Sequence, residues 1–311
     1  MGRVEEWGEG MKWKEFSVRV PASTANLGPG FDSIGLALDL HMTVHVSTGT
    51  EWKVEYADQA YKQLTGGAEN LIVATALAVA KQAGRELPPA ELYVETEIPL
   101  GRGLGSSASA IAAGIEIADC LLGLNLTMDT KLRIGSDMEG HPDNISASLL
   151  GGLTISYFDE QSLEVVHVPE VPISVIILVP PNELLTAESR GLLPESFSHG
   201  CAVRGSAASN VLSAALATGD WTTAGRMMGK DQFHEPFRRS RFPGFEEIQK
   251  ACQQAGAFGS AISGAGPSMF IAVPQDAEKE LADLLTIQFP HYECLVTKPS
   301  SSGIKSCEKV V

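Results

Sequence analysis

Apolar and polar residues follow two different spacings along this chain, and each spacing predicts one kind of element. Strands are predicted where apolar and polar positions alternate or where short apolar runs are bounded by turn residues: residues 16–20, 36–47, 51–56, 92–98, 152–158, 163–168 and 175–179. Helices are predicted where apolar residues recur on one helical face or where alanine and leucine dominate: residues 70–84, 106–122, 129–139 and 206–217. A glycine-rich turn is predicted at residues 257–270, between a helix and a strand.

Length and charge narrow the class of protein. The 311 residues are enough for two domains, at about 150 residues each, and a hydrophobic content of 44% supports buried cores. Lysine and arginine total 23 against 38 for aspartate and glutamate, so the formal net charge is −15. This acidity argues against nonspecific nucleic-acid binding and against an anionic membrane surface. Any anionic ligand must therefore be held by local groups.

Cysteine spacing and the apolar runs bear on location. The five cysteines are odd in number, widely spaced and free of Cys-x-x-Cys pairs, which predicts neither a disulfide framework nor a zinc site. Residues 1–15 are expected to be a flexible extension, and they lack the apolar segment of a secretory signal. The longest apolar run, within residues 171–181, is too short for a membrane span of about 20 residues. We therefore expect a cytoplasmic protein with no membrane partner.

The segment 99–110, Pro-Leu-Gly-Arg-Gly-Leu-Gly-Ser-Ser-Ala-Ser-Ala, carries the strongest chemical signal. Its glycines Gly101, Gly103 and Gly105 let the backbone approach a ligand closely, and two serines open the predicted helix that follows. Loop amides and a helix N-terminus together favour phosphate. The motif is not a Walker loop, because it lacks that loop's lysine. A glycine-rich turn that merely caps a buried helix is the alternative.

Polar residues also gather in residues 21–35, a loop dense in glycine, proline, asparagine and aspartate. Asn26 and Asp32 are bracketed there by Leu27 and Phe31, which predicts a loop packed against the protein. A packed loop that holds a carboxylate often serves a site. An Asx-turn closed by these residues is the alternative.

Two further sets of side chains suit ligand chemistry. Glu139, Asp143 and Asn144 gather carboxylate and amide oxygens, which are hard ligands suited to Mg²⁺, although a Pro-Asp turn between helices would also explain them. Arg190 and Arg238 are possible carboxylate clamps, because the guanidinium fork matches a carboxylate. Solvated surface arginines are the alternative.

The motifs at 21–35, 99–109 and 262–268 follow one another in a recognisable order. With Glu-Gly-His-Pro-Asp-Asn at 139–144 and Ile-Ser-Gly-Ala-Gly-Pro-Ser at 262–268, the chain resembles the GHMP kinase superfamily, and within it the members that phosphorylate homoserine. The resemblance runs from about residue 16 to the last strand. Motifs of this length in this order are far more specific than a single glycine pattern.

The resemblance implies an α+β fold of two domains. Residues 16–160 would form an N-terminal ATP-binding domain with a left-handed βαβ crossover, and residues 161–311 a C-terminal ferredoxin-like domain that binds substrate. The implied reaction is ATP-dependent phosphorylation of the hydroxyl of L-homoserine to O-phospho-L-homoserine in threonine biosynthesis, with Mg²⁺ and in a homodimer. The alternatives are a kinase for another small alcohol, such as mevalonate or a sugar, and a nucleotide-binding homologue without catalysis.

The resemblance also assigns the site residues. Those expected to bind ATP are Asn70, near the adenine, and Pro99, Leu100, Gly101, Arg102, Gly103, Leu104, Gly105, Ser106 and Ser107. Those expected to bind Mg²⁺ are Ser107 and Glu139. Those expected at the homoserine and catalytic subsite are Asn26, Asp32, Asn144, Thr186, Arg190, Arg238, Ser263 and Gly264. Among these, Asp32 would pair the ammonium, and Arg190 and Arg238 would hold the carboxylate.

One departure concerns the charge of the phosphates. Many relatives carry a lysine just before the glycine loop, whereas Glu95, Thr96 and Glu97 stand here. Arg102 or a cation elsewhere must then neutralise the phosphates. Because phosphoryl transfer has a loose transition state, positioning and charge neutralisation contribute most of the catalysis. Asp32 is therefore assigned to binding rather than to proton abstraction.

Overall fold

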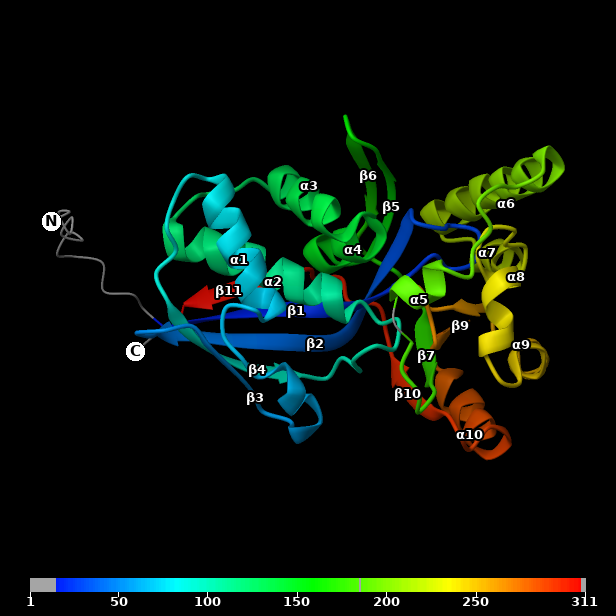
Figure 1. Cartoon of the computed structure of the whole chain (residues 1–311). Coiled ribbons are helices and arrows are strands. Elements are labelled where there is room, and N and C mark those ends of the chain that lie inside the picture. Colours follow the sequence, from blue (N-terminus) through cyan, green and yellow to red (C-terminus); the bar gives the residue numbers. More distant parts are fainter. Residues whose placement is uncertain (1–14, 185, 309–311) are drawn as a thin grey trace, which may run out of the picture.

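The computed structural model describes residues 15–184 and 186–308, which form two β-sheets with helices packed against them (Figure 1). The seven strands of the first sheet are β1 (Phe16–Ala25), β2 (Ile34–Thr48), β3 (Lys53–Tyr56), β4 (Ala90–Thr96), β5 (Leu153–Phe158), β6 (Leu163–Val168) and β11 (Lys305–Glu308). Their order is β11-β1-β2-β4-β3, with β5 pairing β2 and β6 pairing β5. Only β3 and β4 pair in parallel among these described strands, and the handedness of their βαβ crossover stays a prediction.

Helices of the first half lie on one face of this sheet (Figure 1). They are α1 (Leu71–Gln82), α2 (Ser106–Leu122), α3 (Met128–Glu139) and α4 (Asp143–Leu150). Asn70 caps α1, because its Oδ1 accepts a hydrogen bond from the amide of Ile72 at 3.0 Å. The central helix α2 is almost wholly buried, which explains why its sequence is rich in alanine and isoleucine rather than amphipathic.

The second sheet has the ferredoxin-like arrangement that was predicted. Its strands are β7 (Ser174–Val179), β8 (Gly259–Ile262), β9 (Met269–Val273) and β10 (Glu293–Thr297), all antiparallel in the order β10-β7-β9-β8. The accompanying helices are α5 (Thr186–Arg190), α6 (His199–Thr218), α7 (Trp221–Met228), α8 (Glu235–Arg238), α9 (Phe245–Gln254) and α10 (Glu278–Gln288). No helix among the described residues is both long and apolar enough to cross a membrane.

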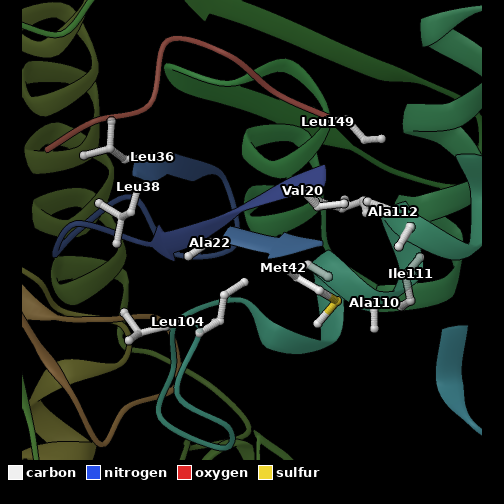
Figure 2. Packing of buried hydrophobic residues seen from close by; sticks show 14 of the residues in the cluster. Val20, Ala22, Leu36, Leu38, Met42, Leu104, Ala110, Ile111, Ala112 and Leu149 are labelled. Atoms are coloured by element: carbon white, nitrogen blue, oxygen red, sulfur yellow. The ribbon is translucent and has the colours of Figure 1, made fainter. Parts of the chain in front are cut away.

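The main core lies where β1, β2 and α2 meet, and it also anchors the glycine loop. Val20 and Leu38 are fully buried there, and Ile111 of α2 is 3% exposed. Leu104, in the middle of the glycine loop, is 1% exposed and belongs to this same cluster (Figure 2). The loop is therefore fixed by burial of one apolar side chain, which leaves its glycine backbone free for a ligand.

Three details differ from the expectations. The strand predicted at 16–20 continues to Ala25, and residues 259–262, expected within a turn, form β8. Strand β6 still pairs with β5, so the chain leaves the first sheet after Val168, beyond the division expected near residue 160. The first two differences arise because residues 22–25 pair with residues 35–38 and residues 259–262 pair with β9, although both stretches are rich in small and turn-forming residues that do not favour strands. The domain limits themselves stay a prediction, and residues 1–14 of the extension expected at residues 1–15 lie outside the described residues.

Candidate active site

A cleft of about 600 Å³ opens between the two sheets. Its walls come from the glycine loop, the loop between β1 and β2, the connection from α3 to α4, and side chains of the second half of the chain. The predicted residues that line it are Asn26, Asp32, Asn70, Leu100, Gly101, Arg102, Gly103, Leu104, Gly105, Ser106, Ser107, Glu139, Asn144, Arg190, Arg238 and Gly264. Most of the predicted site therefore meets in one place.

The glycine loop requires glycine for steric reasons. Gly103 has φ of +72°, and a Cβ there would collide with the carbonyl oxygens of Ser263 and Gly266. Gly105 has φ of +70°, and a Cβ there would collide with the hydroxyl of Ser23. L-residues rarely adopt this left-handed backbone. The loop thus passes so close to its neighbours that no side chain fits between them.

The N-terminus of α2 faces this cleft without a side-chain cap. Its N-cap is Gly105, which offers no capping oxygen, and Ser106 and Ser107 of its first turn line the cleft. Uncapped first-turn amides and the helix dipole together favour an anion at this end. The arrangement fits the phosphate binding that the sequence predicts for the glycine loop and the start of this helix.

Ser107 and Glu139 are in contact beside the N-terminus of α2. The Ser107 hydroxyl donates to Glu139 Oε1 at 2.6 Å, and the Glu139 side chain is only 10% exposed. Burial raises the pKa of Glu139, although the hydrogen bond from Ser107 opposes this. A buried carboxylate beside a hydroxyl is a hard oxygen pair that a divalent cation would stabilise. These two residues therefore fit the Mg²⁺ ligands that were predicted.

Asp32 and Arg190 form a bidentate ion pair on the acceptor side of the cleft. Arg190 donates from Nη1 to Asp32 Oδ2 at 3.0 Å and from Nη2 to Oδ1 at 2.8 Å. Both side chains are about one-third exposed, at 34% and 38%. Asp32 has φ of +52°, and its amide donates to Asn26 Oδ1 at 3.0 Å. The expected ammonium partner and one expected carboxylate partner thus neutralise each other in this structure.

Arg238 is held very differently from Arg190. Its side chain is 1% exposed, and Nη1 donates to the carbonyl of Gly264 at 3.2 Å. Nη1 also lies 3.2 Å from His234 Nδ1. Burial, and then the charge of Arg190, lower the pKa of Arg238 to about 10. The guanidinium still carries its charge at neutral pH, and no carboxylate among the described residues pairs with it within 4.0 Å.

His234 and Phe31 fix the position of that guanidinium, and the sequence motifs predict a site role for neither. His234 Nε2 donates to the carbonyl of Gly28 at 2.9 Å, which leaves Nδ1 to accept from Arg238. Burial lowers the pKa of His234 and favours this neutral form. The Phe31 ring stacks on His234 at 5.2 Å and lies 5.5 Å from Arg238 and 5.7 Å from Arg190. One aromatic ring therefore supports both arginines.

His141 also lines the cleft, and the sequence motifs predict no role for it. Its Nδ1 lies 2.6 Å from Asp143 Oδ1. Burial lowers the pKa of His141, but the Asp143 carboxylate, its hydrogen bond and Glu139 outweigh burial and raise that pKa to about 9. At neutral pH the ring is therefore a cation. Its place in the Gly-His-Pro-Asp-Asn motif was the available signal.

Asn70 and Arg102 line the cleft while holding neighbouring backbone. Asn70 Nδ2 donates to the carbonyl of Leu64 at 3.0 Å, so both ends of its amide already have partners. Arg102 Nη2 donates to the carbonyl of Pro181 at 2.7 Å, and Nη1 lies 3.5 Å from Glu183 Oε1. Arg102 thus ties the glycine loop to the segment that follows β7.

Two predicted residues, Pro99 and Ser263, stand apart from the cleft wall, and a third, Thr186, has a side chain that the structure does not describe. Pro99 is absent from the lining. Ser263 is fully buried, where its hydroxyl lies 2.7 Å from the carbonyl of Gly103 and 2.9 Å from Thr24 Oγ1, so it joins the two glycine-rich segments behind the cleft. Thr186 begins α5, and its side chain lies outside the described part of the structure.

The fold and this cleft agree with the comparisons to known proteins. The chain matches the family GHMP kinases N terminal domain over residues 70–152 and the family GHMP kinases C terminal over residues 212–291. It belongs to the GHMP kinases, which are phosphotransferases with this two-domain fold.

The individual proteins that are similar to this chain carry a more specific name than the family does. Homoserine kinase of Halalkalibacterium halodurans is 44% identical to this chain, over 93% of the chain and 94% of that protein. Homoserine kinase of Bacillus mycoides is 48% identical, over 88% of the chain and 90% of that protein. The crystal structure of homoserine kinase from Cytophaga hutchinsonii has a TM-score of 0.82 at 27% identity, covering 97% of this chain and 100% of that one.

Proposed function

We propose that this enzyme transfers the terminal phosphoryl group of ATP to the hydroxyl of L-homoserine and forms O-phospho-L-homoserine for threonine biosynthesis. One observation supports this above all: a single cleft joins the uncapped start of α2 to a subsite in which the Asp32 carboxylate stands beside the guanidinium groups of Arg190 and Arg238. A phosphate donor suits the first, and a zwitterionic amino acid suits the second. The similarity to homoserine kinases supports the same assignment.

On the donor side, the glycine loop and the first turn of α2 would hold the phosphates. Ser107 and Glu139 would hold Mg²⁺, which supplies charge neutralisation between the phosphates when it is bound. The cation that replaces the missing lysine is His141 in this proposal. Its Nδ1 lies 2.6 Å from Asp143 Oδ1 and its Nε2 lies 3.9 Å from Glu139 Oε2, and carboxylates this close favour the protonated ring. Arg102 would be the second cation that neutralises the phosphates, after its guanidinium leaves Glu183 and binds a phosphate oxygen.

On the acceptor side, bound homoserine would break the ion pair between Asp32 and Arg190. Its ammonium would take Asp32 and its carboxylate would take Arg190, so each charge exchanges one partner for another. Arg238 would complete the carboxylate clamp, because it has no carboxylate partner of its own among the described residues. Asn26 and Asn144 supply neutral polar groups near the acceptor hydroxyl. No strong general base is required for this transfer.

The direct test is ADP release over a panel of acceptors, with the product identified by phosphorus NMR. The panel contains L-homoserine, L-serine, L-threonine, mevalonate and a hexose. We expect turnover with homoserine and a new phosphomonoester signal that depends on Mg²⁺. Turnover with mevalonate or the hexose, and none with homoserine, would overturn the assignment of homoserine as the acceptor. Binding of MgATP and homoserine by calorimetry without any product would instead indicate a catalytically silent homologue. The homodimer and the cytoplasmic location stay predictions.

A further inference from the structure

Phe31 is a large apolar side chain that belongs to neither hydrophobic core of the described chain. It is partly buried and lines the active-site cleft, but it is part of neither cluster of apolar residues. Its neighbours are an imidazole and two cations. The ring of His234 stacks on it at 5.2 Å with 20° between the planes, and the guanidinium carbons of Arg238 and Arg190 lie 5.5 Å and 5.7 Å from its centroid. Packing in a core therefore does not account for the place of this ring.

The loop that carries Phe31 is held at both ends and in the middle. The amide of Asn26 donates to the carbonyl of Ile34 at 2.7 Å, which closes the loop. His234 Nε2 donates to the carbonyl of Gly28 within the same loop at 2.9 Å. The histidine that stacks on the ring thus also binds the backbone that carries it. These contacts give the ring a fixed position beside the two arginines.

The two guanidinium groups beside this ring are a pair of like charges. Burial is the largest cause that lowers the pKa of Arg238, and the positive charge of Arg190 is the second, so the two groups repel each other. Both lie within the range of about 6 Å at which the face of an aromatic ring attracts a cation. The carboxylates whose charges also stabilise Arg238 are those of Asp32, Asp231 and Asp143.

An aromatic ring differs from a carboxylate in what it leaves available on a guanidinium group. Asp32 accepts two hydrogen bonds from Arg190, at 2.8 and 3.0 Å, and it therefore competes with any carboxylate that a ligand brings. The ring of Phe31 attracts the guanidinium groups through its π face and does not take up their N–H donors as a carboxylate does. This arrangement suits a ligand that supplies a carboxylate of its own.

We propose that Phe31 is a positioning residue of the acceptor subsite: its ring holds the guanidinium groups of Arg190 and Arg238 near each other, so that both meet one carboxylate of the acceptor. The inference rests on the proposed function, in which that carboxylate belongs to homoserine. When the ammonium of homoserine takes Asp32, Arg190 loses its ion-pair partner and keeps the ring. The apparent affinity for the acceptor scales with the fraction of molecules in which this clamp is assembled, so a weaker π face weakens binding of the carboxylate.

A series of ring-fluorinated phenylalanines in place of Phe31 tests the proposal on the full chain. One, two or three fluorines largely keep the shape and apolar character of the ring but progressively weaken the negative potential of its face. Calorimetry measures the Kd of L-homoserine and of L-homoserinol, in which a hydroxymethyl group replaces the carboxylate, with a non-hydrolysable ATP analogue bound. We expect the Kd of homoserine to rise with each fluorine toward about tenfold, the combined effect of two cation–π contacts, and the Kd of homoserinol to stay constant.

Two leucine variants give the end point of this series and its control. Phe31→Leu removes the π face and should show the largest rise in the Kd of homoserine. Phe158→Leu is the matched control, because it removes a ring that also lies beside a guanidinium, that of Arg133 at 5.2 Å, outside the cleft. This control should bind homoserine as the parent does. The fluorinated proteins should melt at the parent temperature, since their ring packing is retained.

The outcomes separate the role of the ring from the proposed function. A Kd of homoserine that is constant along the fluorinated series, or that rises equally for homoserinol, overturns the role of Phe31 even if the parent phosphorylates homoserine. A fluorine-dependent Kd in a protein that releases no ADP with homoserine overturns the proposed reaction and supports Phe31 as the positioning residue of an amino-acid site. A parent that binds no homoserine overturns both.

Discussion

The two halves of the candidate active site are built in opposite ways. The donor half presents mainly backbone groups. It consists of three glycines at positive φ and an uncapped helix start, and one buried leucine anchors the loop. The acceptor half is side chain, with a partly exposed ion pair of Asp32 and Arg190 beside the buried Arg238. Backbone amides suit phosphate, which every nucleotide shares, whereas placed charges distinguish one acceptor from another. We therefore expect substitutions in the donor half to change mainly the KM for ATP, and substitutions in the acceptor half to change mainly the KM for homoserine.

The largest effect is expected from Arg238→Ala. It removes a buried cation that we propose binds the acceptor carboxylate, and losses of this kind amount to about 2–5 kcal/mol. We expect kcat/KM for homoserine to fall by about 100-fold or more, mainly through KM, while KM for ATP changes little. Initial rates with each substrate varied in turn measure this. Arg241→Ala is the control, since Arg241 is exposed and outside the cleft. An equal rise in both KM values would contradict the division of roles.

Gly103→Ala should show the converse pattern. A Cβ at this position collides with the carbonyls of Ser263 and Gly266 at a positive φ, and overpacking and left-handed strain each cost about 1–3 kcal/mol. We expect KM for ATP to rise by about 30-fold with a smaller change for homoserine. Gly123→Ala is a matched control, because Gly123 also has positive φ but nothing lies within 4 Å of the place that a Cβ would take there. If both variants behave alike, backbone strain alone explains the loss.

His234→Ala should produce a smaller change on the acceptor side. It removes the ring that accepts from Arg238 and supports Phe31, but it leaves both guanidinium groups present. We expect a rise in KM for homoserine of about tenfold, the effect of one hydrogen bond to a charged group, with KM for ATP unchanged. His234→Asn, which keeps an acceptor near Nδ1, should recover part of the loss. No recovery together with a lower melting temperature would indicate that His234 acts only through stability.

The smallest expected effect is on stability and concerns Glu235, which lies behind the acceptor half. This carboxyl is fully buried, its Oε1 accepts from the amide of Ile262 at 2.6 Å, and its Oε2 has no partner among the described residues. Burial raises its pKa from 4.5 to about 8. Between these values the folded protein keeps a proton that the unfolded chain has released, so the free energy of unfolding falls as pH rises through this window.

Glu235→Gln should remove that dependence and melt above the parent at about pH 8. The melting temperature is measured from about pH 5 to about pH 8 for both proteins. Glu247→Gln, an exposed change on α9, should follow the parent curve. A parent curve that is flat, or a Glu235→Gln curve of the same slope, would show that this carboxyl is ionised in the folded protein.

The sequence by itself determined the parts of this protein that depend on neighbours in the chain. The N-cap at Asn70, the glycine loop with the helix that follows it, and the hairpin of β5 and β6 all follow from local spacing and from residues that fit only particular backbone angles. The order of motifs then indicated the family and a set of site residues, most of which line the cleft.

Only the tertiary structure decided which of those side chains touch. Asp32 and Arg190 are 158 positions apart and pair with each other, and Ser263 turns its hydroxyl to Gly103 behind the cleft. His141, His234 and Phe31 gained roles because folding placed them against charges from other segments. Charge–charge and hydrogen-bond energies depend on distance in space and on burial, and neither quantity is encoded in the spacing of residues along the chain.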